Sequence, residues 1–491
     1  MRYKRSFFLA AMLFVSLTFR SYAIDGLEPG EGFTNADLNG AYAIALSGKD
    51  ANGFFAIGGT FIADGHGRIA SGVLDVNKTP SPVTNLSISG TYNIEAGGRG
   101  AAELTSSAGN FNFVFVTLSH HRALVIRFDQ DATASGSLDL QDSSAFSTSA
   151  LAGTLVFNLT GLGPSGGPMK TVGSFKTNTS GTITGGIQDS SDIGAISTNE
   201  AIKGGSIRME TNGRGTASIN TAAGVRNFAF YVVDADRIKL VETDPLPALA
   251  GDAFRQREPI GNSFPIGSFA FTISGNNLAA GGPFVAGGVF SSDGKGTIIS
   301  GTADFNRVGS IALNMGMSGT YTLDANGRGV GIINAASAGT LNLTLYPTVN
   351  GIQVMETDAG TAVSGAIFSQ HADDLTDANF KGNYGLNHTG ADFLVRDEVD
   401  AVALLTANGR GGATGILDIN GGGSTSSGTP LIGSYSVDST GRGSLILQSP
   451  ARRQNAGIYL VNRNDALFVD LDPALVAVGI IERQRQRQGQ H

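Results

Sequence analysis

The stretch SGTYTLDANGRG, residues 318–329, has the pattern of a strand end, a tight turn and a new strand. Asn-Gly between alternating apolar residues is a strong hairpin signal, because glycine adopts the positive φ of such turns without steric cost. Variants of the stretch occur four times, and each carries one arginine: Arg99, Arg214, Arg328 and Arg442. These arginines are 115, 114 and 114 residues apart, which predicts four similar units in tandem.

Other landmarks keep the same period. Each repeat has an aspartate in a Gly-x-x-Asp segment, a glycine near the expected start of a closing strand, and a glutamine at its end. The aspartates are Asp75, Asp189, Asp304 and Asp418; the glycines are Gly136, Gly251, Gly365 and Gly479; the glutamines are Gln141, Gln256, Gln370 and Gln484. Between them run short alternating apolar segments without a helical pattern. About eight strands per repeat is the spacing of an antiparallel meander.

The first strand of the first repeat shows which face it buries. Tyr42, Ile44 and Leu46 share one face, and alanines 41, 43 and 45 share the other. Large side chains on one face and small ones on the other suit a curved sheet with a filled concave side. We therefore expect an all-β fold of four eight-stranded barrels, since closure removes exposed sheet edges. A two-sheet sandwich in each repeat is the alternative.

The period and the composition divide the chain into seven segments. They are a signal peptide (1–23), a lead-in (24–36), four β repeats (37–142, 143–258, 259–372 and 373–484) and a basic tail (485–491). The signal peptide is expected from a basic start, an apolar core too short to span a bilayer, and the site Ser21-Tyr22-Ala23. A short N-terminal anchor is the alternative. The tail is expected to be solvated, with weak contact to an anionic envelope surface as the alternative.

The composition favours an exported protein and excludes several kinds of chemistry. The chain has 70 glycines and 15% charged residues, yet 41% hydrophobic residues, enough for packed cores. It has no cysteine, which excludes disulfides, thiolate metal sites and a cysteine nucleophile. Removing residues 1–23 would change the net charge from −8 to −12, which argues against nucleic-acid binding. No later apolar run is long enough for a transmembrane helix, and the absent Trp girdle disfavours an outer-membrane barrel.

The Gly-x-Tyr strand start (Gly40-Ala41-Tyr42) and the eight-strand meander resemble the calycin architecture of lipocalins and avidins. This resemblance covers each repeat as a pattern and implies a barrel that can hold a small apolar ligand inside. It transfers no functional residue, because the lipocalin Gly-x-Trp hallmark and the biotin-stacking tryptophans of avidin need Trp, and the chain has none. The chain also resembles tandem Gly-rich repeat proteins that bacteria export, a group without an established activity.

The motif search predicts no catalytic, cofactor-binding or metal site. Six histidines are scattered, and the adjacent His120 and His121 would point to opposite faces of a strand. Asp-Gly-x-Gly turns such as the one at Asp64 supply at most one carboxylate each, whereas calcium takes six to eight oxygens, so they are interpreted as turn formers. No nucleophile elbow or complete phosphate loop is present.

The one Asp and one Arg of each repeat are the sharpest polar signal. They could form a carbohydrate or anion contact made four times. The favoured interpretation is a structural bridge or a turn-stabilising hydrogen bond that shapes each domain, since duplication alone explains the recurrence.

Three functions follow from these features. The first is an exported non-enzymatic protein for adhesion, matrix building or glycan contact, where weak repeated sites gain by avidity. The second is a carrier with a small apolar ligand inside each barrel. A hydrolase ranks last, because no paired carboxylates or triad recur. The expected partner is a surface glycan or matrix, or a small apolar ligand.

Overall fold

The computed structural model describes residues 32–257, 266–336 and 339–486, and these are mostly β-strand. The strands form four closed antiparallel barrels in tandem, as expected from the sequence, and no sandwich is found among the described residues. The expected signal peptide, most of the lead-in and residues 487–491 of the tail lie outside the described residues.

Barrel 1 is an up-and-down meander in which each strand pairs with the next and β8 closes onto β1. Its strands are β1 (Asn39–Asp50), β2 (Gly53–Asp64), β3 (Arg68–Lys78), β4 (Val83–Ile94), β5 (Arg99–Ser106), β6 (Gly109–Ser119), β7 (Arg122–Phe128) and β8 (Ala132–Leu140).

Barrel 2 has nine strands because the strand equivalent to β4 is split into two. The pieces β12 and β13 both pair with β11, and β17 closes onto β9. The strands are β9 (Gly153–Leu162), β10 (Pro168–Thr177), β11 (Thr182–Asp192), β12 (Ala195–Ile202), β13 (Gly204–Met209), β14 (Arg214–Thr221), β15 (Gly224–Asp234), β16 (Arg237–Glu242) and β17 (Ala248–Arg255).

Barrels 3 and 4 repeat the eight-stranded pattern of barrel 1. Barrel 3 comprises β18 (Gly267–Asn277), β19 (Gly282–Ser292), β20 (Thr297–Arg307), β21 (Ser310–Leu323), β22 (Gly329–Ala335), β23 (Gly339–Thr348), β24 (Gly351–Glu356) and β25 (Thr361–Ser369). Barrel 4 comprises β26 (Lys381–Asp392), β27 (Asp397–Asn408), β28 (Gly412–Gly421), β29 (Ser424–Val437), β30 (Arg442–Gln448), β31 (Arg453–Leu460), β32 (Asp465–Asp470) and β33 (Leu475–Arg483).

Among the residues that the structure describes, short 3₁₀ helices precede barrel 1 and connect barrels. The helix η1 (Asn35–Asp37) precedes β1, η2 (Ser143–Ala145) connects barrels 1 and 2, and η4 (Ala372–Asp374) connects barrels 3 and 4.

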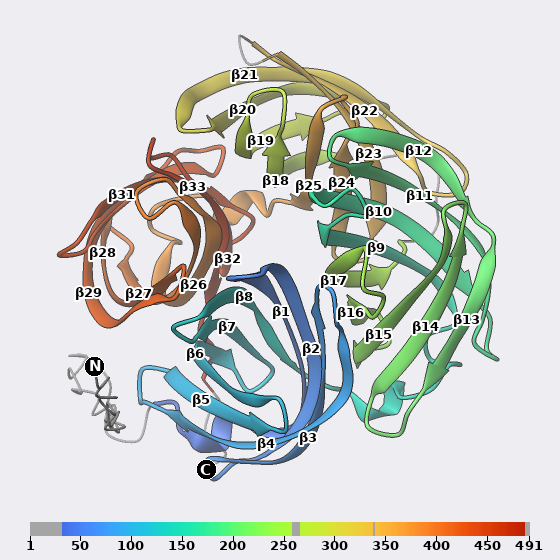
Figure 1. The fold of residues 1–491 in the computed structure, drawn as a ribbon. Helices are drawn as coiled ribbons and strands as arrows, with labels where there is room; N and C mark the ends of the chain where they lie inside the picture. Colours follow the sequence, from blue (N-terminus) through green and yellow to red (C-terminus); the bar gives the residue numbers. More distant parts are fainter. Residues whose placement is uncertain (1–31, 258–265, 337–338, 487–491) are drawn as a thin grey trace, which may run out of the picture.

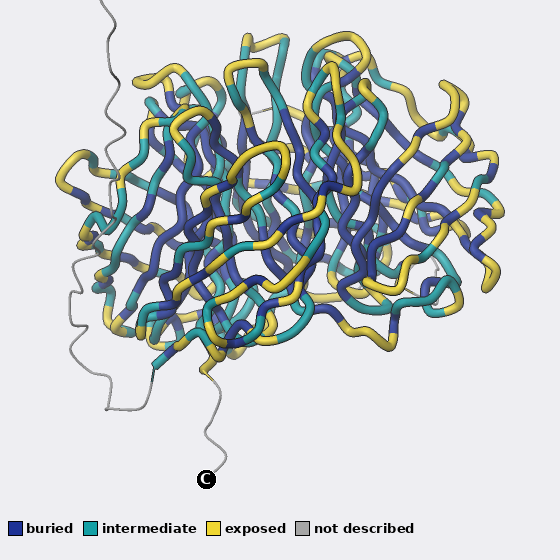
Figure 2. The backbone as a smooth tube through the Cα atoms, turned by 60° about the horizontal axis from the view of Figure 1, so that its bottom comes forward, coloured by how far each residue is buried: buried dark blue, intermediate teal, exposed yellow. Residues whose placement is uncertain are grey.

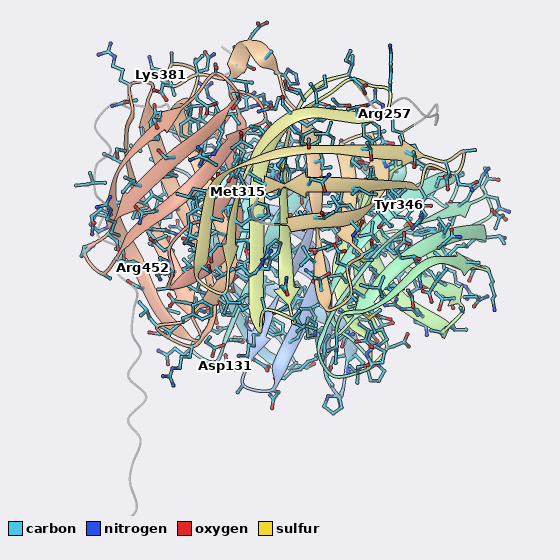
Figure 3. The ribbon with its side chains drawn as sticks, turned by 90° about the horizontal axis from the view of Figure 1, so that it is seen from above. Asp131, Arg257, Met315, Tyr346, Lys381 and Arg452 are labelled. Carbon is cyan, nitrogen blue, oxygen red and sulfur yellow. The ribbon has the colours of Figure 1, made fainter. Side chains whose placement is uncertain are left out.

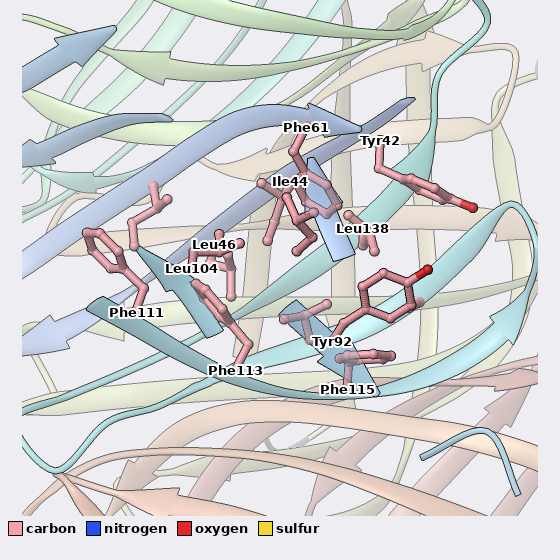
Figure 4. Close-up of a cluster of buried hydrophobic side chains, with 14 of the residues drawn as sticks. Tyr42, Ile44, Leu46, Phe61, Tyr92, Leu104, Phe111, Phe113, Phe115 and Leu138 are labelled. Atoms are coloured by element: carbon pink, nitrogen blue, oxygen red, sulfur yellow. The ribbon is translucent and has the colours of Figure 1, made fainter. Parts of the chain in front are cut away.

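The barrel interiors are filled by the large apolar side chains on one face of each strand. In β1, Tyr42, Ile44 and Leu46 are buried in the core of barrel 1 together with Phe113 and Leu138 (Figure 4). This confirms the face expected from the alternation. Figure 2 shows the buried positions along the strands and the exposed ones mainly in the loops at both ends.

The closing strands begin earlier than the sequence indicated. The strand β8 starts at Ala132, so Gly136 lies in its middle. A Cβ at Gly136 would lie 1.9 Å from the carbonyl oxygen of Ala45 in β1. The recurring glycine therefore permits close approach of the last strand to the first, and does not mark the strand start.

The four barrels lie around a common centre in chain order, so barrel 4 also lies beside barrel 1 (Figure 1). Barrels 1 and 4 are in direct contact, for example between Lys49 Nζ and Asp397 Oδ1 at 2.6 Å. The tandem array is therefore a closed ring.

Candidate functional site

The recurrent arginine and aspartate meet between barrels. Each arginine donates two or more hydrogen bonds to the aspartate of the preceding barrel, with N···O distances of 2.5 to 3.2 Å. The pairs are Arg214 with Asp75, Arg328 with Asp189, Arg442 with Asp304 and Arg99 with Asp418. The expected bridge within each repeat is therefore wrong. In barrel 1, Asp75 lies on β3 and Arg99 lies on β5, with β4 between them. The two residues therefore do not bind each other, and each binds a residue of a neighbouring barrel.

The last of these pairs closes the ring. Arg99 of barrel 1 binds Asp418 of barrel 4, although they are 319 residues apart in the chain. The same two surfaces are used head to tail at all four interfaces, and such heterologous contacts form a ring when the rotation between units closes.

A tyrosine completes three of the four interfaces. Tyr231, Tyr346 and Tyr459 each donate their hydroxyl to the aspartate that the neighbouring arginine of the same barrel also binds. Figure 3 labels Tyr346 where barrels 2 and 3 meet. Burial and then the adjacent aspartate raise the pKa of these phenols, so they stay protonated and act as donors.

Sequence reasoning missed these tyrosines because they lie in apolar strands that read as core. The available signal was a Tyr at the same position in three of the four repeats.

The glutamine at the end of each closing strand also reaches the next barrel. Gln141 Nε2 donates to the carbonyl of Val232 at 2.6 Å, and Gln484 of barrel 4 donates to the carbonyl of Thr117 of barrel 1 at 2.8 Å. The remaining members, Gln256 and Gln370, make the equivalent kind of contact. Three sequence landmarks, the Asp, Arg and Gln of each repeat, thus serve the ring interfaces.

The Asp-Gly-x-Gly turns form as the turn interpretation expects. Asp64 Oδ1 accepts the backbone N–H groups of His66 and Arg68 at 2.7 and 3.0 Å. Asp293 accepts those of Lys295 and Thr297 in the same way. His120 and His121 lie in the turn between β6 and β7. Within residues 32–257, 266–336 and 339–486, no group of three or more His, Asp or Glu side chains could hold a metal ion.

The barrel interiors leave little room for a ligand in the two barrels where a cavity is seen. The cavity in barrel 1 has a volume of about 20 Å³ and that in barrel 2 about 10 Å³. A water molecule needs about 10–15 Å³ measured in this way. The cavity beside Phe113 in barrel 1 is thus about the size of one water molecule.

Two much larger pockets lie where all four barrels meet. The first, here called the Arg122 pocket, has a volume of 840 Å³ and is lined by residues that include Arg122, Arg237, Phe368, Asp465 and Glu482. The second, the Lys170 pocket, has a volume of 710 Å³ and is lined by residues that include Ser47, Thr160, Lys170, Ser274 and Thr389. They occupy opposite ends of the inner strands, since β18 contributes Phe269 to the first and Ser274 to the second.

Side chains of different barrels are hydrogen-bonded to one another on the inner strands. Asn158 Nδ2 of barrel 2 donates to Gln353 Oε1 of barrel 3 at 3.2 Å, and Ser135 Oγ of barrel 1 donates to Asn387 Oδ1 of barrel 4 at 2.8 Å.

One wall of the Arg122 pocket is an ion-pair network from barrels 4, 1 and 2. Arg122 binds Glu482 through Nε at 2.8 Å and Asp139 through Nη1 at 2.6 Å. Arg237 and Lys239 bind Asp139 from barrel 2, at 3.2 and 2.8 Å. Burial acts to raise the pKa of Asp139, but the charges of Arg122, Lys239 and Arg237 outweigh it and hold the pKa well below its usual value. The network is therefore charged and fixed in place.

The facing wall comes from barrel 3 and is mainly apolar, although Thr348, Asn350 and Ser369 also line it. It includes Phe269, Ile352, Ile367 and Phe368, and barrel 3 has Gly351 where barrels 1 and 2 have the arginines of the network. The pocket thus combines rigid hydrogen-bonding groups on one side with an aromatic and aliphatic surface on the other.

In the part of the chain that the structure describes, no helix has the length and apolar character needed to cross a bilayer.

Comparisons with known proteins give no family. No family model matches the chain, and no curated protein matches it. Solved structures that share some similarity include transferrin binding protein B (mutant Trp-176-Ala) from Haemophilus parasuis Hp5, at 10% identity over 77% of this chain and 86% of that chain, with a TM-score of 0.21. Another is isotype 1 transferrin binding protein B from serogroup B Neisseria meningitidis, at 10% identity over 74% and 84%, with a TM-score of 0.18. Similarity at this level carries no argument about function.

Proposed function

We propose that this chain is an exported, non-enzymatic binding protein that holds a glycan unit in the Arg122 pocket. The observation that carries the proposal is the pocket itself, 840 Å³ in volume and built jointly by four barrels. Ligand pockets usually occupy about 300–1,000 Å³ and combine apolar surface with a few placed polar groups.

The two walls of the pocket match the two sides of a sugar ring. A sugar carries hydroxyls around its edge and C–H groups on its faces. The guanidinium of Arg122 and the carboxylate of Glu482 are planar groups with hydrogen-bonding capacity for the edge, while Phe368 offers an apolar face. The ion pairs fix these groups in advance, which reduces the ordering cost of binding.

The ring geometry also bears on the alternatives. The recurrent Asp and Arg, a candidate for four repeated glycan contacts, are engaged with each other at the interfaces. The cavities of about 20 and 10 Å³ in barrels 1 and 2 give an apolar ligand no room there. One shared axial pocket therefore replaces four equivalent sites as the proposed binding site.

A glycan array probed with the chain from residue 24 onward tests the proposal, followed by calorimetry on the best sugar. We expect saturable binding with one sugar per chain. Phe368→Ala should weaken it roughly tenfold through loss of apolar contact. Val225 on β15 is exposed and does not line the pocket, so Val225→Ala should leave binding unchanged. Absence of any sugar bound, or equal affinity in the Phe368 variant, would contradict the proposal.

A further inference from the structure

The pocket at the other end of the ring contains an ammonium group without a partner. Lys170 on β10 is only 9% exposed and lines the Lys170 pocket. Its Nζ forms no hydrogen bond or ion pair with any residue that the structure describes. Burial alone lowers the pKa of Lys170 to about 8, so no nearby carboxylate stabilises its charge, and the amine is still mostly protonated at pH 7.

A set of hydroxyls surrounds the axis at this end. Ser47, Thr160, Ser274 and Thr389 occupy the same position in the first strand of each barrel, and all four line the pocket. Lys170 is paired with Thr160 across β10 and β9, so their side chains lie on the same face of the sheet. Thr389 lies near Asp400 and acts to lower the pKa of its carboxyl, whereas the hydroxyls of the other three make no hydrogen bond with a described residue.

The acidic groups of this pocket are already neutralised. Asp397 binds Lys49 at 2.6 Å, and Asp392 binds Arg452 at 2.5 Å. Burial, and then the neighbouring Asp400, raise the pKa of Glu398 well above its usual value, which keeps it protonated. Lys170, together with Arg396, which also lines the pocket, therefore leaves the pocket with uncompensated positive charge.

A buried ammonium is costly unless it is paired, and hydroxyls can donate to an anion that pairs with it. We propose that the Lys170 pocket binds the oxyanion group of a small ligand (a carboxylate, sulfate or phosphate), with Lys170 as its counter-ion and the hydroxyls of Ser47, Thr160 and Ser274 as further donors. This site is separate from the glycan site proposed at the opposite end, and neither proposal depends on the other.

The test is calorimetric titration of the chain from residue 24 onward with three probes: sodium acetate, sulfate and inorganic phosphate, at constant ionic strength. We expect at least one probe to bind saturably with one site per chain, and the preferred probe identifies the oxyanion. Lys170→Met should weaken that binding roughly tenfold or more, because the charge-assisted contact is lost. Lys176→Met, on the same strand but exposed, should leave it unchanged.

Thermal unfolding separates a binding role from a structural one. Without a ligand, Lys170→Met should raise the melting temperature, because an unpaired buried charge is removed, and the preferred probe should raise the melting temperature of the wild-type chain only. A lower melting temperature of the variant without ligand would assign Lys170 to the fold. That result, no saturable binding of any probe, or equal affinity in the variant would overturn the proposal.

Discussion

Barrel 1 and the three barrels after it share one framework, but barrel 1 departs from the others at two positions of interest. Barrel 1 has Val116 where the others have the interface tyrosines Tyr231, Tyr346 and Tyr459. It has Arg127 where the others have acids, namely Glu242, Glu356 and Asp470. The first difference concerns the interface that closes the ring, and the second concerns the barrel interior.

At the closing interface, apolar packing stands in place of a phenol. Val116 packs with Leu124 of barrel 1 and with Val402 and Leu404 of barrel 4. Arg99 Nη2 also donates to Ser427 Oγ at 2.6 Å. The comparison shows that the Arg–Asp pair is present at every interface of the ring. The tyrosine that joins this pair at three interfaces is replaced by valine at the closing interface.

In the interior, barrel 1 places a cation where the other barrels place an acid. The guanidinium of Arg127 lies 5.1 and 5.3 Å from the ring centroids of Phe55 and Phe111 and binds Asp129 at 2.6 Å. In barrel 2 the acid at this position, Glu242, instead needs Arg226, which binds it through two hydrogen bonds. Barrel 1 thus holds a cation paired with Asp129 at this position, and barrel 2 holds an acid bound by an arginine.

The largest expected effect comes from removing an interface aspartate. Asp75→Ala leaves Arg214 and Tyr231 buried without their shared acceptor, and such a loss costs about 3–5 kcal/mol of unfolding free energy. Asp418→Ala should cost about 1 kcal/mol less, because no phenol is left unpaired at the closing interface. Urea unfolding measures both values.

Asp131→Ala provides the control for these two variants, since its side chain is 81% exposed and should contribute less than about 0.5 kcal/mol. Equal costs for Asp75 and Asp418 would remove the distinction between the two interfaces. A cost near that of the control would show that the pairs do not hold the ring.

The second prediction concerns the space made for the tyrosine. Gly58 pairs with Asp75 in register, and a Cβ there would lie 2.6 Å from Tyr231 Cε2. Gly58→Ala should therefore destabilise the protein by about 1–3 kcal/mol. At the closing interface the equivalent residue is Val402, which faces Val116 instead.

Adding Tyr231→Val to Gly58→Ala should recover part of the lost stability, because the smaller valine leaves room for the new methyl group. The closing interface has a valine at the position of Tyr231. Additive losses in the double variant, measured by thermal unfolding, would show that the steric account is wrong.

The third prediction is a pH dependence caused by the interior acids of barrels 3 and 4. Burial raises the pKa of Glu356 to about 7 and that of Asp470 to about 7. Between pH 4.5 and 7 the folded protein holds protons that the unfolded chain has released, so stability should fall as pH rises through this window. The side chain in Glu356→Gln cannot titrate. The variant should therefore lose about 1–3 kcal/mol less unfolding free energy than the wild type over this pH window. An unchanged slope in urea unfolding at pH 5 and pH 8 would contradict this assignment.

The smallest expected effect is that of an interface glutamine. Gln484→Ala removes hydrogen bonds of 3.0 and 2.8 Å to barrel 1, and Gln370→Ala removes bonds of 3.0 and 2.7 Å between barrels 3 and 4. Each should cost about 1 kcal/mol. Equal shifts in melting temperature would show that the closing interface is as well formed as an internal one, whereas no shift for Gln484 alone would indicate an open ring.

The sequence predicts the barrels well because their contacts are local. Hairpin turns and the alternation of Tyr42, Ile44 and Leu46 constrain each strand with its neighbour in the chain. The recurring Asp and Arg were recognised as polar landmarks, but not the barrels that they connect. Their period is the same in an open string and in a closed ring, so spacing cannot distinguish Asp75 binding Arg99 from Asp75 binding Arg214.

The pockets were missed for a related reason. Each pocket is assembled from short stretches of all four barrels, and these are hundreds of positions apart in the chain. The hydroxyls of Ser47, Thr160, Ser274 and Thr389 do recur at one position of the repeat, and this was a usable signal. The arginine of the charged wall recurs in only two repeats, as Arg122 and Arg237. Barrels 3 and 4 have Gly351 and Asp465 at the equivalent position.

Ring closure is tested most directly by zero-length carbodiimide cross-linking of the monomer, followed by peptide mass spectrometry. Lys49 Nζ and Asp397 Oδ1 lie 2.6 Å apart across the interface of barrels 1 and 4. Lys78 Nζ and Asp50 Oδ2, 2.5 Å apart within barrel 1, provide the internal control. A closed ring predicts that both amide cross-links form. Recovery of the Lys78–Asp50 link without the Lys49–Asp397 link would contradict closure.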